Sequence, residues 1–347
     1  MPDTLTNPYR GTGLPGASKY PAADPAPVQE LLGHCPAHHP TPLHTSPALA
    51  DRLGVARLWL KDERERMRLG SFKALGAAYA IARTAAQAGG PWENALKGRT
   101  FVTASAGNHG LSVAAGARLF GAEAMIFLSE TVPEGFAARL RDKGATVVRA
   151  GATYEDSMAA AEAAADQDAR TLLSDSSWPG YVDLPFRVME GYLQLAAEAV
   201  DQMSAIPTHI VLQAGVGGLA AAVAAHARAV WGDEPTIAVV EPDAAPALIE
   251  SIRAGKLVTT AGPVSAMGRL DCKTPSMIAL AGLARDADLF MTITEQQAQA
   301  GVEVLAKAGL ATTPSGGAGF AALLAGTQGV GDGARVLAIL SEGPEDG

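Results

Sequence analysis

A lysine stands at the start of a predicted helix in the segment RLGSFKALGAAYA. Ser71 has the side chain of a helix N-cap, and helix-forming residues follow it as far as Gly89 and Gly90. Lys73 therefore lies in the first turn, where the helix dipole disfavours an exposed cation by roughly 0.3–1 kcal/mol. Burial beside Phe72 would also lower the pKa of the amine, and a neutral amine is a nucleophile. The alternative interpretation is a solvated surface lysine.

A glycine-rich loop joins a predicted strand to a predicted helix in QAGVGGLAAA. Gly215, Gly217 and Gly218 let backbone amides approach an anion, and a helix N-terminus favours negative charge. A phosphate cradle is the functional interpretation, and a tight turn is the alternative. The spacing is not that of a dinucleotide-binding fingerprint, which has three spaced glycines and a later acidic residue.

Two further loops carry polar side chains at predicted strand ends. In TASAGNHG, the backbone amides and the Ser105 hydroxyl could hold a carboxylate, and the Asn108 amide could donate to a ring oxygen. In LAILSEG, Ser341 ends a predicted buried strand. Taken alone, the first loop is also explained as a polar N-cap with a chance histidine, and the serine as a structural residue.

Predicted strands and helices alternate over most of the chain, which indicates βαβ units on parallel sheets. We expect a compact α/β protein with two lobes and a cleft between them, preceded by an irregular arm of about thirty residues. The predicted strands are ARLWLKDE, RTFVTA, AEAMIFLS, ATVVRA, HIVLQA, TIAVVEP and RVLAILS. The predicted helices include NHGLSVAAGARLFG, PEGFAARLRDKG, YEDSMAAAEAAADQD, APALIESIRAG and QQAQAGVEVLAKAG.

Composition narrows the class of protein. The 347 residues are 48% hydrophobic and 18% charged, which is typical of a soluble protein of roughly two domains. A net charge of −9 without a basic run argues against nucleic acid or a membrane surface as a partner. Cys35 and Cys272 lie far apart, the histidines are scattered, and no signal-peptide pattern opens the chain. We expect a cytoplasmic protein without a metal site.

Together, and in this order, GSFKALGA, SAGNHG, GVGGLAAA and ILSEG resemble the pyridoxal-phosphate enzymes of fold type II, the tryptophan synthase β-subunit group. The resemblance extends from PTPLH to ILSEG, which is nearly the whole chain. It implies a two-lobed α/β fold with parallel-rich twisted sheets flanked by helices. It also implies a large cofactor-anchoring domain of residues 1–90 and 169–347, a small αβα domain of residues 91–168, and a homodimer.

The resemblance assigns roles to individual residues. It implies that Lys73 forms the Schiff base with pyridoxal phosphate and, once substrate displaces it, removes the α-proton. It places Asn108 at the ring hydroxyl and Ser341 at the pyridine nitrogen, which a serine would leave largely unprotonated, favouring β-elimination. The implied phosphate-binding residues are Gly215, Val216, Gly217, Gly218 and Leu219. The implied substrate-binding residues are Ser105, Gly107, Asn108 and His109.

Within the family, SDSSWPGYVDLPFRVMEGY is similar to a segment of the diaminopropionate ammonia-lyases. There the aspartate matching Asp175 lies near the side-chain amine of the substrate, although a loop-capping role would also explain it. Ala106 departs from those enzymes, which typically use an aspartate at this position on the D-substrate. The SAGNH form resembles L-threonine dehydratases, whereas serine racemases tend to have a serine at Ala106. Thr313 also departs, since relatives often have a glutamate there near the cofactor ring.

We therefore predict a pyridoxal-phosphate lyase that converts a small L-amino acid to a 2-oxo acid and ammonia by α,β-elimination. The overall resemblance favours 2,3-diaminopropionate as the substrate, and the loop around Ala106 favours threonine or serine. A β-replacement enzyme of the cysteine synthase type is a second possibility. A non-catalytic α/β nucleotide-binding module is a third.

Overall fold

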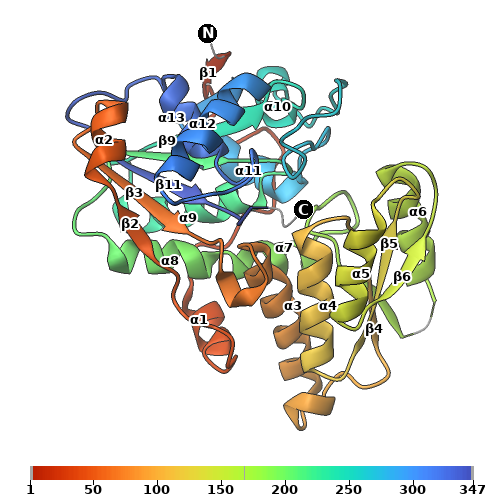
Figure 1. Cartoon of the computed structure of the whole chain (residues 1–347). Coiled ribbons are helices and arrows are strands. Elements are labelled where there is room, and N and C mark those ends of the chain that lie inside the picture. The colour runs from red at the N-terminus through yellow and green to blue at the C-terminus, as the bar shows by residue number, and fades with distance from the viewer. Residues whose placement is uncertain (1–2, 168, 345–347) are drawn as a thin grey trace.

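The chain folds into two β-sheets flanked by helices, as the computed structural model of residues 3–167 and 169–344 shows (Figure 1). The larger sheet has the strand order β1-β10-β9-β8-β11-β3-β2, and the smaller sheet has the order β6-β5-β4-β7. We call each sheet with its helices a lobe. The arrangement confirms the predicted two-lobed α/β class. Within the described part of the chain, no helix is both long and apolar enough to cross a membrane.

The strands divide between the two sheets, and helices connect most of them. The larger sheet contains β1 (Thr4–Thr6), β2 (Leu43–Thr45), β3 (Arg57–Asp62), β8 (His209–Gln213), β9 (Thr236–Pro242), β10 (Leu289–Ile293) and β11 (Arg335–Leu340). The smaller sheet contains β4 (Thr100–Ala104), β5 (Glu123–Leu128), β6 (Thr146–Arg149) and β7 (Arg170–Leu172). The helices are α1 (Ala26–Leu32), α2 (Pro47–Leu53), α3 (Lys73–Ala88), α4 (Asn108–Leu119), α5 (Glu134–Asp142), α6 (Tyr154–Ala165), α7 (Asp183–Gly191), α8 (Leu193–Gln202), α9 (Gly218–Trp231), α10 (Ala247–Ala254), α11 (Met277–Asp286), α12 (Glu295–Lys307) and α13 (Ala318–Ala325). Short 3₁₀ turns are η1 (Arg66–Arg68) and η2 (Trp92–Asn94).

The centre of the larger sheet is parallel. Strands β10, β9, β8, β11 and β3 pair in one direction, and only the edge strands β1 and β2 of the described sheet are antiparallel. Residues 210–212 and 336–340 are apolar and buried, as expected for strands covered on both faces. Because parallel strands end at one edge, the glycine loop after β8 and Ser341 after β11 leave the sheet on the same side.

The smaller sheet is parallel throughout its described strands. Strand β7 pairs with β4, with Thr171 opposite Phe101, although it follows the expected domain boundary at residue 168. We propose that the small domain extends through β7, and the rest of the expected division stays a prediction. Residue 168 itself and the outer limits at residues 1 and 347 lie outside the described residues.

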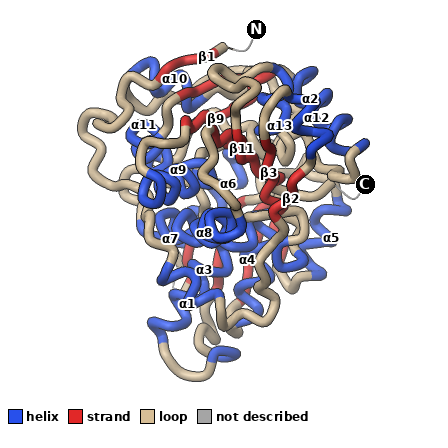
Figure 2. The backbone as a smooth tube through the Cα atoms, turned by 90° about the vertical axis from the view of Figure 1, so that its left-hand side faces the viewer, coloured by secondary structure: helices blue, strands red, loops and turns tan. Residues whose placement is uncertain are grey.

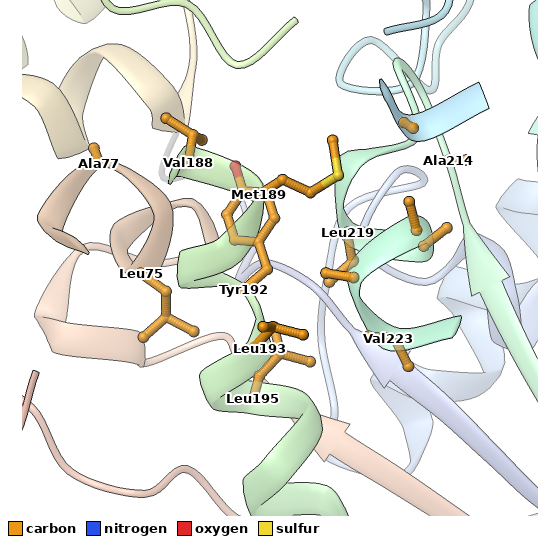
Figure 3. Close-up of a cluster of buried hydrophobic side chains, with 14 of the residues drawn as sticks. Leu75, Ala77, Val188, Met189, Tyr192, Leu193, Leu195, Ala214, Leu219 and Val223 are labelled. Atoms are coloured by element: carbon orange, nitrogen blue, oxygen red, sulfur yellow. The ribbon is translucent and has the colours of Figure 1, made fainter. Parts of the chain in front are cut away.

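Helix α7 packs against α3 on one side and α9 on the other (Figures 2 and 3). Helices α3 and α7 cross at two glycines. A Cβ atom on Gly76 would lie 2.6 Å from Cε1 of Tyr192, and one on Gly191 would lie 2.6 Å from the carbonyl oxygen of Leu75. Both distances are shorter than real Cβ contacts, so this crossing requires residues without a side chain. Tyr192 and Leu75 pack in the core beside the crossing (Figure 3).

A buried charge network holds the segment between β3 and α3. Glu198 of α8 accepts hydrogen bonds from Lys61 and Arg66, each with an N–O distance of 2.7 Å. Arg66 also pairs with Glu63 at 2.7 Å, and the side chains of Lys61, Glu63 and Arg66 are fully buried. Mutual pairing offsets the cost of removing these charges from water. The network thereby fixes the chain just before the lysine helix.

The expectation of an irregular N-terminal arm is wrong for two segments. Strand β1 pairs antiparallel with β10, and α1 buries Val28 and Leu32. Both elements are too short for hydrophobic periodicity to reveal them, because β1 has three residues and α1 has seven. Their packing partners lie far away in the sequence.

Candidate active site

Lys73 is the first residue of α3, as the sequence indicates, but the predicted cap is wrong. Phe72 is the N-cap residue, and no side chain caps the helix. Ser71 forms an isolated antiparallel bridge with Glu342 after β11, and its buried hydroxyl has no hydrogen-bond partner among the described residues. The amide of Phe72 donates to the carbonyl of Ser341 at 3.1 Å. Tertiary pairing with the chain after β11 therefore positions the start of the lysine helix.

The Lys73 ammonium donates a hydrogen bond to Oδ2 of Asp175, which follows strand β7 of the small lobe. The two side chains are only 21% and 20% exposed. Burial by itself would lower the pKa of Lys73, but the adjacent carboxylate outweighs burial and raises that pKa above its ordinary value. Burial would raise the pKa of Asp175, and Lys73 in turn holds it well below its usual range. The expected low pKa of Lys73 is thus wrong for this structure, because the sequence does not show its anionic neighbour.

Two aromatic rings flank the lysine amine. Nζ of Lys73 lies 5.2 Å from the ring centroid of Phe72 and 5.9 Å from that of Tyr192, distances at which cation–π attraction operates. The buried Tyr192 ring also adjoins the glycine loop, since a Cβ atom on Gly218 would lie 3.4 Å from its Cε2. The lysine and the glycine loop therefore meet at the same tyrosine. The sequence indicates Tyr192 only as part of a longer similar segment.

The glycine loop between β8 and α9 needs its glycines for two different reasons. Gly217 has φ +97°, in the left-handed region that favours glycine. A Cβ atom on Gly215 would lie 2.9 Å from Sγ of Cys272 and 3.0 Å from the carbonyl oxygen of Arg269. Helix α9 begins directly after this turn without a side-chain cap, and the glycine backbone before it lets an anion come close to the amides. Such a helix start is suited to a phosphate group.

The SAGNHG loop is held by its own polar groups. Oγ of Ser105 accepts hydrogen bonds from the amides of Gly107 at 3.2 Å and Gly110 at 3.1 Å. The buried His109 ring contacts the carbonyl of Leu173 through Nε2 at 2.8 Å, and burial lowers its pKa. These contacts tie the start of α4 to the chain just before Asp175. The predicted role of this loop in substrate binding stays a prediction.

Asn108 contacts the carboxylate of Glu342, a residue for which the sequence motifs predict no role. Its Nδ2 donates to Oε2 of Glu342 at 2.5 Å, while the hydroxyl of Thr313 donates to Oε1 of the same side chain. Nε of Arg269 lies 3.8 Å from Oε2. The sequence does contain a signal that could have indicated a role for Glu342 in the site. This charged residue stands next to Ser341, directly after a predicted buried strand.

Cys272 and Tyr154 also border the site, although no sequence pattern indicated a role for them there. Burial, and then the charge of Asp175, raise the pKa of the Cys272 thiol to about 12. Tyr154 as a whole is 54% exposed, but local desolvation of its hydroxyl and then the charge of Asp175 raise the pKa of that hydroxyl above its ordinary value. Tyr154 begins α6 of the small lobe, and Cys272 precedes α11 of the large lobe. Both lobes therefore contribute side chains near the Lys73–Asp175 pair.

A lysine amine beside a glycine turn suited to phosphate, on a two-lobed parallel α/β fold, defines an enzyme that binds a phosphorylated carbonyl cofactor. The chain belongs to the family of pyridoxal-phosphate dependent enzymes, whose family model matches residues 35–342. The expected cofactor, pyridoxal 5′-phosphate, is thereby confirmed. The alternative of a non-catalytic nucleotide-binding module has no support in this comparison.

Relatives of known activity within this family include ammonia-lyases and dehydratases that act on amino acids. Diaminopropionate ammonia-lyase of Escherichia coli (strain K12) is 32% identical over 292 residues, which are 80% of this chain and 72% of that protein. Human L-serine dehydratase/L-threonine deaminase is 30% identical over 273 residues, which are 77% of this chain and 76% of that protein. The solved structure of Escherichia coli diaminopropionate ammonia lyase with D-serine has a TM-score of 0.87 at 26% identity, covering 99% of this chain and 94% of that chain.

The described residues fit the cofactor. Lys73 supplies an amine for the aldehyde, and the turn around Gly217 supplies glycine backbone and an uncapped helix start for the phosphate. A Cβ atom on Gly215 would lie only 2.9 Å from Sγ of Cys272, so the close packing of this turn against Cys272 requires glycine. When bound, pyridoxal phosphate supplies an electron sink that acidifies the α-proton of an amino acid.

Proposed function

We propose that the chain is an ammonia-lyase that acts by α,β-elimination on a small L-amino acid, with 2,3-diaminopropionate as the favoured substrate. The observation that carries this proposal is the contact between Asp175 and the Lys73 ammonium. Asp175 already pairs with an amine in a site that is largely screened from water. When Lys73 is engaged by the cofactor, the same carboxylate is available for the β-ammonium group of the substrate. Serine and threonine offer only a neutral hydroxyl there.

The reaction requires a separate task of each member of this pair. Lys73 removes the α-proton, which passes from Cα of the substrate to Nζ. Asp175 holds the β-nitrogen in its protonated form by a charge-assisted hydrogen bond, so that it leaves as neutral ammonia. With one molecule of water, diaminopropionate gives pyruvate and two molecules of ammonia. Serine gives pyruvate and one molecule of ammonia, and no net water is consumed.

The remaining assignments of the site rest on the resemblance and on the placement of the loops. Asn108 is assigned to the ring hydroxyl and Ser341 to the pyridine nitrogen. In support, Asn108 bonds to Glu342, and the carbonyl of Ser341 accepts from the amide of Phe72, next to Lys73. Phosphate is assigned to Gly215, Val216, Gly217, Gly218 and Leu219. The substrate carboxylate is assigned to Ser105, Gly107, Asn108 and His109. Ala106 has no acidic or hydroxyl group that could act on the second face of the substrate, which favours L-amino acids.

The experiment that tests the proposal measures ammonia and 2-oxo acid together, with each candidate substrate and with Asp175→Asn. We expect two molecules of ammonia per 2-oxo acid from diaminopropionate. Loss of a buried charge partner costs about 2–5 kcal/mol, so kcat/KM for diaminopropionate should fall about 100-fold. The value for L-serine should change much less. An equal loss on both substrates would contradict the role of Asp175.

A serine or threonine dehydratase is the second candidate, favoured by Ala106 and by the human relative. A higher kcat/KM for L-threonine than for diaminopropionate in the wild-type chain would establish it. A β-replacement enzyme would instead convert an activated serine and sulfide to a new amino acid without releasing a 2-oxo acid. A homodimer, by resemblance to relatives, and a cytoplasmic location complete the proposal. Size-exclusion chromatography with light scattering tests the dimer.

A further inference from the structure

We propose that Glu342 is a positioning residue for the cofactor ring. Its carboxylate joins Asn108 of the small lobe to Thr313 of the large lobe and fixes the amide assigned to the ring hydroxyl. The inference rests on the proposed placement of Asn108 in the cofactor site. It adds a residue to which neither the resemblance nor the comparisons assign a role.

The carboxylate of Glu342 is held from two sides. Oε2 accepts from Nδ2 of Asn108 at 2.5 Å, and Oε1 accepts from the hydroxyl of Thr313. The residue is only 5% exposed, and its carbonyl accepts from the hydroxyl of Thr312 at 2.6 Å. The antiparallel bridge to Ser71 holds its backbone next to the start of α3. Both the side chain and the backbone of Glu342 are thus anchored.

A positive charge accompanies this carboxylate. Nε of Arg269 lies 3.8 Å from Oε2, and Nη1 of Arg269 donates to the carbonyl of Ala106 at 3.4 Å. The guanidinium therefore contacts the SAGNHG loop as well as Glu342. A cation beside a buried carboxylate offsets part of its desolvation cost. The site can retain a buried acid at this point because Arg269 accompanies it.

The orientation of an amide depends on its hydrogen bonds. An ionised carboxylate accepts hydrogen bonds and cannot donate them, so Nδ2 of Asn108 faces Glu342 and the direction of the second N–H is fixed. A charged acceptor forms a stronger hydrogen bond than a neutral one. The departure at Thr313 fits this picture. Relatives often have a glutamate at this position, whereas here Thr313 binds a carboxylate supplied from the end of β11.

The test is a titration of the cofactor-free protein with pyridoxal phosphate, followed by absorption spectroscopy, for the wild type, Glu342→Ala, Asn108→Ala and the double variant. Without the charged acceptor that orients Asn108, Kd for the cofactor should rise about tenfold in Glu342→Ala, with a shifted absorption maximum. In the Asn108→Ala background, the same substitution should add little. Glu342→Gln, which keeps an acceptor, should restore part of the affinity.

Two controls separate positioning from damage to the fold. Glu190→Ala removes a carboxylate of similar burial that pairs with Arg187 on α7, and it should leave Kd and the spectrum unchanged. Thr313→Val is nearly isosteric and should weaken cofactor binding in the same direction as Glu342→Ala, by a smaller factor. It keeps the inference testable if Glu342→Ala does not fold.

Several results would overturn the inference. One is wild-type affinity and spectrum in Glu342→Ala, or in Thr313→Val where that variant alone folds. Another is an effect of Glu342→Ala that is just as large without Asn108. If Asn108→Ala itself leaves the cofactor unaffected, its placement fails and the inference fails with it. The outcome is independent of substrate choice, because cofactor binding is measured without an amino acid. A failure of the proposed elimination would show only in the ammonia and 2-oxo acid assays.

Discussion

At the scale of single residues, the site is organised around Lys73, whose surroundings shift the pKa of its amine in opposite directions. Burial and the helix start favour a neutral amine, whereas Asp175 favours the cation and prevails in this structure. The sequence could predict the lysine and its helix from local patterns. It could not predict the state of the amine, because that state depends on residue 175, which is about a hundred positions away.

Removal of the amine gives the most direct prediction. Lys73→Ala should abolish the borohydride-reducible link to pyridoxal phosphate and the visible absorption that accompanies it. The measurement is the mass of the reduced protein and its absorption spectrum. Lys143→Ala, at the exposed C-cap of α5, is the matched control and should retain both signals. A reducible link that survives in Lys73→Ala would show that another lysine anchors the cofactor.

At the scale of elements, helix starts and strand ends bring the chemistry together. The alternating pattern predicted β8, β11, α4 and the loops between them, because these elements are long and regular. It did not predict that Ser71 pairs with Glu342, or that Tyr192 adjoins both Lys73 and the glycine loop. Such contacts join segments that are distant in the sequence, and local propensity contains no information about them.

The turn before α9 should be sensitive to a single methyl group. Gly217→Ala places a side chain on backbone with φ +97°, with Cβ 3.1 Å from that of Ala279. Left-handed backbone costs a residue with a side chain about 1–2 kcal/mol, and relaxation of the turn would displace the amides assigned to phosphate. We expect Kd for pyridoxal phosphate to rise about tenfold, as measured by titration of the cofactor-free protein.

The opposite end of the same helix provides a matched control. Gly232 has φ +59°, and nothing lies within 4 Å of an added Cβ. Gly232→Ala should therefore also be strained by its positive φ and lower the melting temperature, without affecting Kd for the cofactor. Equal weakening of cofactor binding by both substitutions would argue against a phosphate site at Gly217.

At the scale of the whole molecule, stability depends on the buried charges that connect β3, η1 and α8. Burial would raise the pKa of Glu198, but Arg66 and Lys61 lower it to about 2. A group with a depressed pKa in the folded state contributes stability above its unfolded pKa, which is near 4.5, and loses that contribution as the pH falls towards 2. The network therefore makes the fold sensitive to acid.

Glu198→Gln should be markedly less stable than the wild type at neutral pH. Removing one partner of a buried charge network costs about 3–5 kcal/mol, so the free energy of unfolding at pH 7 should fall by that amount. The variant should also lose part of the dependence of stability on pH between about 4.5 and 2, as measured by denaturant unfolding at several pH values. A stability that declines with acid as steeply as in the wild type would assign the acid sensitivity to other carboxylates.

The glycine crossing of α3 and α7 has a consequence for how the enzyme can vary. Gly76 lies one turn along α3 from Lys73, and Gly191 directly precedes Tyr192. The close contact between these two backbones sets the distance between α3 and α7, and with it the distance between the Lys73 amine and the Tyr192 ring. Any wider residue at the crossing would push the amine and the ring apart. Substitutions of Gly76 or Gly191 should thus impair catalysis even where the rest of the core could accommodate the added side chain.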